Sequence, residues 1–382
     1  MPSINTSKVD LRTLFSNDFL FCIPHYQRPY SWGKEQCEQL IEDLFEANRE
    51  NDYFLGTCIL QQNGVHGQST QYEIIDGQQR ITTLQILLAC LRDLVEDEQY
   101  KKPTQDKIYQ AANPADGVAE TIRLKVRSID RQFFRDYVQK CGGTNSIGES
   151  SPTDSIKQRI KENIIFFKES LINKGQEYIK ELILFLSTKC VMIYVSTESF
   201  EDAFRLFSIT NDRGLQLRKI DILKSFNLNP DYYTDCPDDI TRYSQMWESM
   251  ENDLGANKFE HLLASIRSIY VKEKQRKDLM SEYRERIFNN NHINPGPDFI
   301  DNLKRHKDVY QSLILDKNQF DSNNDYNNII VRYKNLIYLM EKHMPIMEWI
   351  SPLISYNIKY GNENLWIFLT MLFTVKNTSL HS

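Results

Sequence analysis

The chain has 382 residues, a length that predicts two or three domains. Hydrophobic residues make up 41% and charged residues 26%, which excludes a collagen-like or wholly disordered chain. The net charge of −6 excludes a protein that coats DNA through general basicity. Residues 101–230 nevertheless carry an excess of five positive charges, so this segment is the place to look for a local basic patch that contacts nucleic acid.

The sequence lacks the usual features of membrane, secreted and metal-binding proteins. No apolar run approaches the ~20 residues that a membrane helix needs, and the first residues do not form a secretory signal. The seven cysteines are scattered without a Cys-x-x-Cys pair, which predicts neither zinc nor disulfides. We therefore expect no membrane partner and a reducing, cytoplasmic location.

The first part of the chain predicts an alternation of strands and helices. Apolar runs rich in β-formers predict strands at residues 19–26, 53–62, 72–75, 120–127 and 190–196. Apolar residues at helical spacing predict helices at residues 34–49, 78–95, 130–138, 155–187, 200–209 and 219–226. Residues 141–154 are rich in Gly and Ser and predict a flexible insert.

After Pro230 the predicted strands stop and a run of helices follows. We therefore predict an α/β domain over residues 1–230, with a helical insertion at about 97–187. An all-helical domain should follow over residues 231–382. The fold class is α+β.

The most informative motif is Asp76-Gly77-Gln78-Gln79-Arg80, followed by Thr82 and Thr83. A strand ends, a glycine turns the chain and a helix begins, so free N–H groups and the helix dipole favour an anion there. Arg80 suits phosphate oxygens, Asp76 suits Mg²⁺, and either glutamine suits a water. The alternative is that Asp76 only caps the helix and pairs with Arg80.

A second stretch places Tyr26, Gln27 and Arg28 between two prolines, with Tyr30 and Trp32 following. Aromatic side chains beside Gln and Arg can stack on a base and bind its edge. The alternative is that the aromatic residues pack beneath the next helix and only Arg28 is exposed.

Two weaker signals follow. Asn211, Arg213 and Gly214 lie where a helix runs into a loop, which presents Arg213. Arg123, Lys125 and Arg127 alternate along the predicted strand 120–127, so they share one face and suit a nucleic-acid backbone. The alternative in both cases is a solvated surface.

Four stretches then occur in the order and composition of one known family: Ile23-Pro24-x-Tyr26-Gln27-Arg28-x-Tyr30-x-Trp32, Phe54-Leu55-Gly56, Ile75-Asp76-Gly77-Gln78-Gln79-Arg80-x-Thr82-Thr83-Leu84, and Asn211-x-Arg213-Gly214. Together they closely resemble the GmrSD-type restriction family, whose N-terminal domain is ParB/sulfiredoxin-like. The resemblance covers about residues 8–226, and the helical remainder is also similar to that family.

The resemblance implies a bacterial anti-phage restriction factor, often of the modification-dependent, type IV-like kind. Such proteins bind and hydrolyse nucleoside triphosphates with the Asp-Gly-Gln-Gln-Arg segment. They cut DNA through a His-Asn-His-type nuclease module, on a partner subunit or on a further domain. This sequence shows neither a nuclease centre nor a phosphate loop of the Gly-x-x-x-x-Gly-Lys kind.

The motifs and the resemblance together give three groups of site residues; the resemblance itself implies Asp76, Gln78, Gln79 and Arg80 for hydrolysis and Tyr26, Gln27 and Arg28 for nucleotide or modified DNA. The nucleotide-hydrolysis residues are Asp76, which would also hold Mg²⁺, Gln78, Gln79 and Arg80. The nucleotide-binding residues are Gly77, Thr82, Thr83, Arg28, Asn211, Arg213 and Gly214. The DNA-binding residues, for modified phage DNA, are Tyr26, Gln27, Tyr30, Trp32, Arg123, Lys125 and Arg127.

Three functions stay open on the sequence. The first is a DNA-sensing subunit that hydrolyses a nucleoside triphosphate with Mg²⁺. The second is a switch module that binds nucleotide or DNA without hydrolysis and regulates a partner nuclease. The third is a scaffold in which every motif only caps a helix. A homo-oligomer is compatible with each of them.

Overall fold

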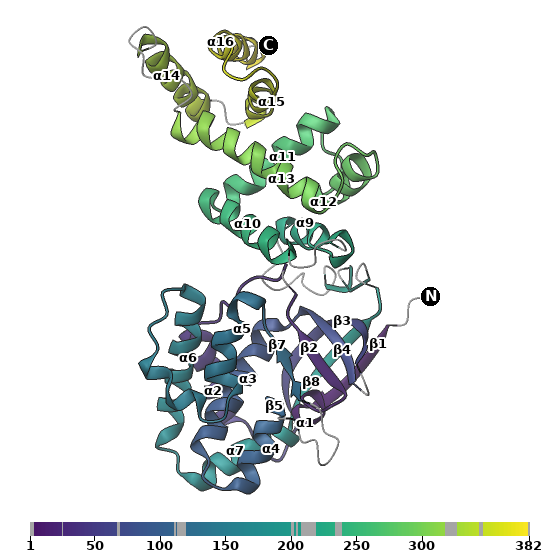
Figure 1. Ribbon diagram of the computed structural model, residues 1–382, viewed down its shortest axis with the longest axis vertical. Coiled ribbons are helices and arrows are strands. Elements are labelled where there is room, and N and C mark those ends of the chain that lie inside the picture. The colour runs from purple at the N-terminus through teal and green to yellow at the C-terminus, as the bar shows by residue number, and fades with distance from the viewer. Residues whose placement is uncertain are drawn as a thin grey trace. The chain divides into compact units, whose positions relative to one another are not determined.

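A computed structural model shows two compact units, Met1–Leu217 and Arg218–Ser382 (Figure 1). The structure describes residues 4–24, 26–66, 69–110, 112, 120–199, 202–203, 205–207, 219–233, 239–317, 327–343 and 347–380. The sequence predicts a boundary near residue 230, and the contacts divide the chain at Leu217.

The unit Met1–Leu217 is built on a mixed sheet of six strands in the order β1-β8-β3-β4-β2-β7. The strands are β1 (Asn5–Asp10), β2 (Phe19–Cys22), β3 (Tyr53–His66), β4 (Ser69–Asp76), β7 (Leu124–Lys125) and β8 (Cys190–Thr197). β4 is antiparallel to β3 and parallel to β2. It therefore runs inside the sheet, and its last residue, Asp76, pairs with Ile59 of β3.

Helices pack against this sheet, and α2, α3, α6 and α7 lie on one side of it (Figure 1). The helices of this unit are α1 (Leu11–Leu14), α2 (Lys34–Glu46), α3 (Gln78–Leu94), α4 (Glu98–Asp106), α5 (Ser128–Phe134), α6 (Ser155–Ile172) and α7 (Gln176–Thr188). Every residue of α3 from Ile81 to Arg92 is buried. A helix buried on all sides is central to its core, so α3 is held firmly against its neighbours.

The strand predicted at residues 120–127 is broken. Thr121–Ile122 forms β6, which pairs with β5 (Tyr109–Gln110) in a separate two-stranded sheet. Leu124–Lys125 forms β7 at the edge of the main sheet, beside β2. Arg123 lies between the two short strands, so the expected single strand with one basic face is not formed.

The prediction of a flexible insert at residues 141–154 is wrong. Gly143–Asn145 and Ile147–Glu149 form short 3₁₀ turns. The buried carboxylate of Asp93 accepts hydrogen bonds from the backbone of Gly142 and from the backbone and hydroxyl of Thr144. Asp93 also pairs with the buried Arg92 at 2.7 Å. A tertiary contact, which glycine and serine content does not reveal, therefore orders the segment.

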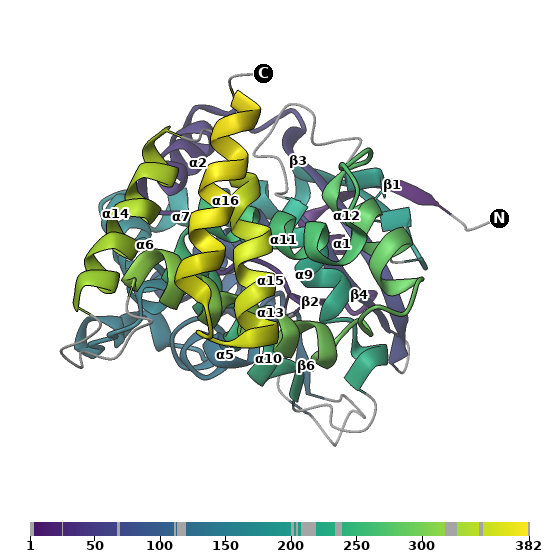
Figure 2. The same cartoon turned by 90° about the horizontal axis from the view of Figure 1, so that it is seen from above.

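The unit Arg218–Ser382 contains helices and no strand among its described residues, which confirms the expected all-helical region. Its α-helices are α9 (Lys219–Asn227), α10 (Asp239–Leu254), α11 (Ala256–Val271), α12 (Leu279–Glu282), α13 (Pro297–Tyr310), α14 (Asn327–His343), α15 (Ile350–Tyr360) and α16 (Leu365–Leu380). Trp247 packs edge-on against Phe259 in the core. The last three helices lie beside one another, with α14 and α15 both in contact with α16 (Figure 2). No described helix is long and apolar enough to cross a membrane.

A buried ion pair fixes the loop between α11 and α12. Arg267 donates to Glu282 from Nε at 3.1 Å and from Nη2 at 2.6 Å. Glu282 also accepts from the backbone N–H groups of Arg276 and Lys277. Burial alone would raise the pKa of Glu282, but these hydrogen bonds and the Arg267 charge lower it to about 2.

We predict that the helical unit loses stability in acid through Glu282. Its lowered pKa favours the folded state above about pH 4.5, and that contribution disappears as the pH falls toward 2. Glu282→Gln should cost about 3 kcal/mol at pH 7 and flatten the acid part of the profile, because it leaves Arg267 buried and unpaired. Denaturant titrations followed by tryptophan fluorescence measure this.

The matched control for that prediction is Glu285→Gln. Glu285 pairs with Lys277 at the surface, where its side chain is 47% exposed. Such surface pairs contribute less than about 1 kcal/mol. Similar losses for the two variants, or an unchanged acid profile in Glu282→Gln, would contradict the assignment.

Candidate functional site

The turn between β4 and α3 depends on glycine. Gly77 has φ 91°, a left-handed conformation that side-chain-bearing residues rarely adopt. A Cβ at this position would lie 2.9 Å from Cβ of Cys58. Gly77 therefore turns the chain abruptly and places Asp76 directly before the first N–H groups of α3, which have no partners within the helix.

Asp76 is partly buried beside two positive charges. Burial raises its pKa above the usual range, and the Gly77 N–H and the charges of Arg80 and Arg28 offset this only in part. Asp76 forms no ion pair with any described residue. Gly77 is the N-cap residue of α3, and no side chain caps this helix end. The alternative of a capping Asp76 paired with Arg80 is therefore not what the structure shows.

Arg80 is held by β3 instead of by Asp76. Its Nη1 donates to the carbonyl of Thr57 at 3.3 Å. The guanidinium lies directly on Gly56, where a Cβ would come within 2.6 Å of Nη1. This contact explains the glycine of the Phe54-Leu55-Gly56 motif. Sequence analysis did not assign Gly56 or Thr57 to the site, although a glycine inside a strand often marks a close approach.

Gln78 and Gln79 bind the backbone of the loop that contains Arg28. Gln78 Nε2 donates to the Arg28 carbonyl at 3.0 Å. Gln79 Nε2 donates to the Pro29 carbonyl, and its Oε1 accepts from the N–H groups of Ser31 and Trp32. These four contacts form what we call the glutamine latch. Both polar atoms of the Gln79 amide are thus engaged within the protein, so Gln79 is not presented to a water.

The same loop binds back to β4. Gln27 is 8% exposed and donates from Nε2 to the Ile75 carbonyl at 2.9 Å. Tyr26 is 5% exposed and reaches Glu73 through its hydroxyl at 3.4 Å. Tyr30 is also buried, and its hydroxyl contacts Thr83 and Asn163. The expectation that these residues form an exposed base-reading surface is therefore corrected, since they pack inside the domain.

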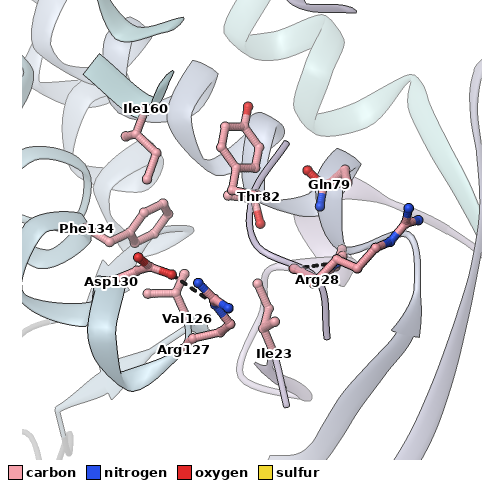
Figure 3. Close-up of a pocket in the computed structure, with 11 residues that line it drawn as sticks. Ile23, Arg28, Gln79, Thr82, Val126, Arg127, Asp130, Phe134 and Ile160 are labelled. Atoms are coloured by element: carbon pink, nitrogen blue, oxygen red, sulfur yellow. Dashed lines mark hydrogen bonds and ion pairs between the residues drawn. The ribbon is translucent and has the colours of Figure 1, made fainter. Parts of the chain in front are cut away.

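Arg28 is the exception in this loop. It is partly exposed, and its side chain forms no hydrogen bond or ion pair with the described residues. Figure 3 shows its guanidinium pointing away from the ion pair of Arg127 and Asp130. Trp32 is partly buried, and its backbone is held by the latch. Arg28 thus remains available to a ligand.

The two threonines of α3 lie inside the domain. Thr83 is fully buried and donates to the Gln79 carbonyl. Thr82 is 4% exposed and lines a cavity of about 20 Å³ together with Arg28, Gln78 and Gln79 (Figure 3). That volume accommodates about one water molecule. Asn211, Arg213 and Gly214 lie outside the described residues.

The expected basic stripe is not formed. Arg123 is 3% exposed and donates to Ser16, Asn17, Asp106 and Gln110. Arg127 is 6% exposed and pairs with Asp130 at 3.1 Å. Lys125 alone of the three is exposed. Arg123 lies between the short strands β6 and β7, and Arg127 lies between β7 and α5. Neither continues an exposed strand, and both side chains are buried.

The described residues contain no cluster of three His, Cys, Asp or Glu side chains that could hold a metal ion. Asp76 is thus a single carboxylate. Mg²⁺ is commonly bound through one or two carboxylates together with substrate phosphates. The donor set therefore fits a metal that arrives with a nucleotide and does not fit a resident metal ion.

Comparison with protein families gives the class of this protein as a component of a DNA restriction system. The matching family is described as GmrSD restriction endonuclease, N-terminal domain, and the match covers residues 11–228, more than half of the chain. The chain belongs to this family, which confirms the resemblance seen in its motifs. It is a component of a GmrSD-type restriction system. A search of curated proteins found no match.

We predict that Gly77→Ala destabilises the α/β unit by about 1–3 kcal/mol, through a strained backbone and the contact with Cys58. Gly64→Ala is the matched control, because Gly64 also has a positive φ, 99°, but nothing lies within 4 Å of its Cβ position. Denaturant titration of both variants compares them. A Gly64→Ala loss as large as that of Gly77→Ala would show that the Cys58 contact contributes nothing.

We predict that Gln79→Ala loosens the loop, because it removes three hydrogen bonds from Pro29, Ser31 and Trp32. Amide hydrogen exchange across residues 29–33 should become at least about tenfold faster, and stability should fall by about 1–3 kcal/mol. Gln39→Ala is the control, since Gln39 is exposed and its side chain bonds only the side chain of Asp43. Unchanged exchange in Gln79→Ala would mean that the loop is held without the latch.

Proposed function

We propose that this chain binds a nucleoside triphosphate with Mg²⁺ at the turn between β4 and α3 and hydrolyses it. The cycle would control DNA cleavage by a His-Asn-His-type nuclease on a partner subunit or a further domain. The target would be DNA, in particular modified phage DNA, in the cytoplasm. The observation that carries the proposal is the state of Asp76, a partly buried carboxylate beside two guanidinium groups and ion-paired with no described residue.

The turn has the groups that a polyphosphate requires. The first N–H groups of α3 and its dipole favour an anion. Arg80 is fixed by Gly56 and Thr57, so its guanidinium is pre-positioned. The positive charge of Arg28 also acts on the Asp76 carboxylate, from a loop that the glutamine latch fixes. Two guanidinium groups of this kind stabilise the charge that develops on transferred phosphate oxygens.

Asp76 is the residue that would meet both metal and water. Mg²⁺, when bound with the nucleotide, would neutralise phosphate charge. The carboxylate of Asp76 would supply one ligand oxygen and orient the attacking water through the other.

A second candidate function is a switch that binds nucleotide without turnover. The glutamine latch favours it, because both polar atoms of the Gln79 amide bind backbone groups and leave that side chain unable to orient a water. In this case nucleotide binding would change the loop at residues 28–32 and signal to a nuclease without hydrolysis. Turnover measurements separate the two functions.

We predict that the chain releases phosphate from a nucleoside triphosphate and that Asp76→Asn lowers kcat at least about 100-fold, because the variant keeps the shape but loses the charge. Arg28→Gln should lower kcat/KM by at least about tenfold without unfolding the protein, since its side chain is unpaired. The assay screens the common triphosphates with Mg²⁺, with and without plain or modified phage DNA.

The control for this prediction is Glu42→Gln, an exposed residue of α2. Equal rates in wild type and Asp76→Asn would remove the catalytic assignment. Binding of a triphosphate without turnover under any DNA condition would establish the switch. Absence of binding, measured by calorimetry with every nucleotide, would leave the turn without a ligand and overturn both candidates.

A further inference from the structure

A second pocket of the α/β unit lies away from the turn. It has a volume of about 470 Å³ and lies between α4 and the π-helical turn Arg135–Gln139, next to Tyr109 of β5. This volume is within the range of small-molecule sites, about 300–1,000 Å³. None of the residues assigned above to the nucleotide or DNA sites lines it.

The helix α3 separates this pocket from the turn at Asp76. Asp76 precedes the first turn of α3, whereas Arg92 lies in its last turn. Arg92 donates from Nη1 to Gln105 Oε1 at 2.7 Å and to the Val138 carbonyl at 2.9 Å. Seventeen helical residues span roughly 25 Å, so the two places are distinct sites at opposite ends of one buried helix.

The floor of the pocket is rigid and polar. Gln105 Nε2 donates to the carbonyls of Tyr109 and Gln139, and Gln139 Nε2 donates to the Leu124 carbonyl. Beneath them Arg92 and Asp93 form an ion pair with fully buried side chains. Such a pair adds little stability compared with an apolar core, but it fixes geometry. The π-helical turn above it is a form found frequently at functional sites.

The rim is cationic. Lys102, Arg135 and Lys140 line the pocket, and their side chains form no hydrogen bond or ion pair with the residues that the structure describes. Two carboxylates accompany them. Asp136 accepts hydrogen bonds from Gln132 at 3.0 Å, and Asp106 lies on α4. The charged lining is therefore mixed, with an excess of one positive charge.

This combination narrows the class of ligand. A neutral apolar ligand would gain nothing from the three exposed cations, and a densely charged polyanion would meet two carboxylates. A nucleoside phosphate satisfies all the groups. Its phosphate would lie on Lys102, Arg135 and Lys140, its base would stack on the ring of Tyr109, and its hydroxyls would donate to a carboxylate.

We propose that the pocket between α4 and the turn Arg135–Gln139 is a second nucleotide site, which takes a nucleoside phosphate as a free mononucleotide or as one unit of single-stranded nucleic acid. The site does not depend on hydrolysis at Asp76. Both sources present the same phosphate, sugar and base, and the experiment distinguishes them.

Cys141 provides the readout. It lines the pocket and is exposed, whereas the other described cysteines are buried or partly buried. Alkylation of Cys141 in the full chain by a maleimide, quantified by peptide mass spectrometry, should slow roughly tenfold when the probe is at ten times its dissociation constant. The probes are the four ribonucleoside monophosphates, a short oligothymidylate, and inorganic phosphate at matched ionic strength.

The variant Lys102→Glu with Arg135→Glu should abolish protection, and so should Lys140→Glu, which serves if the double variant folds poorly. Lys334→Glu is the charge-matched control, because Lys334 is exposed on α14 of the other unit. Asp76→Asn should keep full protection, so failure of the proposed hydrolysis and failure of this site give different results.

Protection by monophosphates assigns the free nucleotide, and protection by the oligonucleotide alone assigns nucleic acid. Either result supports the site. Equal protection by inorganic phosphate would show that the protection of Cys141 is only charge screening, and this result would overturn the proposed site. Protection that survives in Lys102→Glu with Arg135→Glu and in Lys140→Glu, or no protection by any probe, would also overturn it.

Discussion

The site depends on a reciprocal attachment between two segments that lie about fifty positions apart in the chain. Gln27 donates to the carbonyl of Ile75. In return, Gln78 donates to the carbonyl of Arg28 and Gln79 to that of Pro29. Because glutamine side chains of each segment donate to backbone carbonyls of the other, the position of Asp76 relative to Arg28 is fixed. The motif glutamines therefore act here as positioning residues, and the charged residues are left to meet a ligand.

The buried helix α3 gives this arrangement its rigidity. It begins at the Gly77 turn and ends at the Arg92–Asp93 pair, which orders the segment at Gly142 and Thr144. Because almost the whole helix is buried, a displacement at one end cannot be absorbed by solvent-exposed turns. The proposed nucleotide site and the second pocket would thus be built on the two ends of one stiff element.

The sequence indicates the elements of this fold better than their contacts. Strong periodicity predicted α3 almost to the residue, and the glycine break predicted the turn at Gly77. The prediction of a strand with Arg123 and Arg127 on one exposed face was wrong, because strand alternation says nothing of a break that turns both side chains inward. The role of Gly56 beneath Arg80 was also missed, since only the folded sheet brings them together.

The strongest argument for a ligand at the turn comes from comparison with the other buried acids of this protein. Asp93, Asp130 and Glu282 each pair directly with an arginine. Glu73, whose pKa burial also raises, has no arginine partner but accepts hydrogen bonds from Tyr26 and Asn63. Asp76 is partly buried beside two arginines, yet none of them contacts it, and its pKa is raised. Burial of a carboxylate that only the Gly77 N–H binds is unfavourable, and Arg80 is held on Thr57 instead of moving to it. A polyphosphate with Mg²⁺ would resolve both features, because it brings negative charge for the arginines and a cation for Asp76.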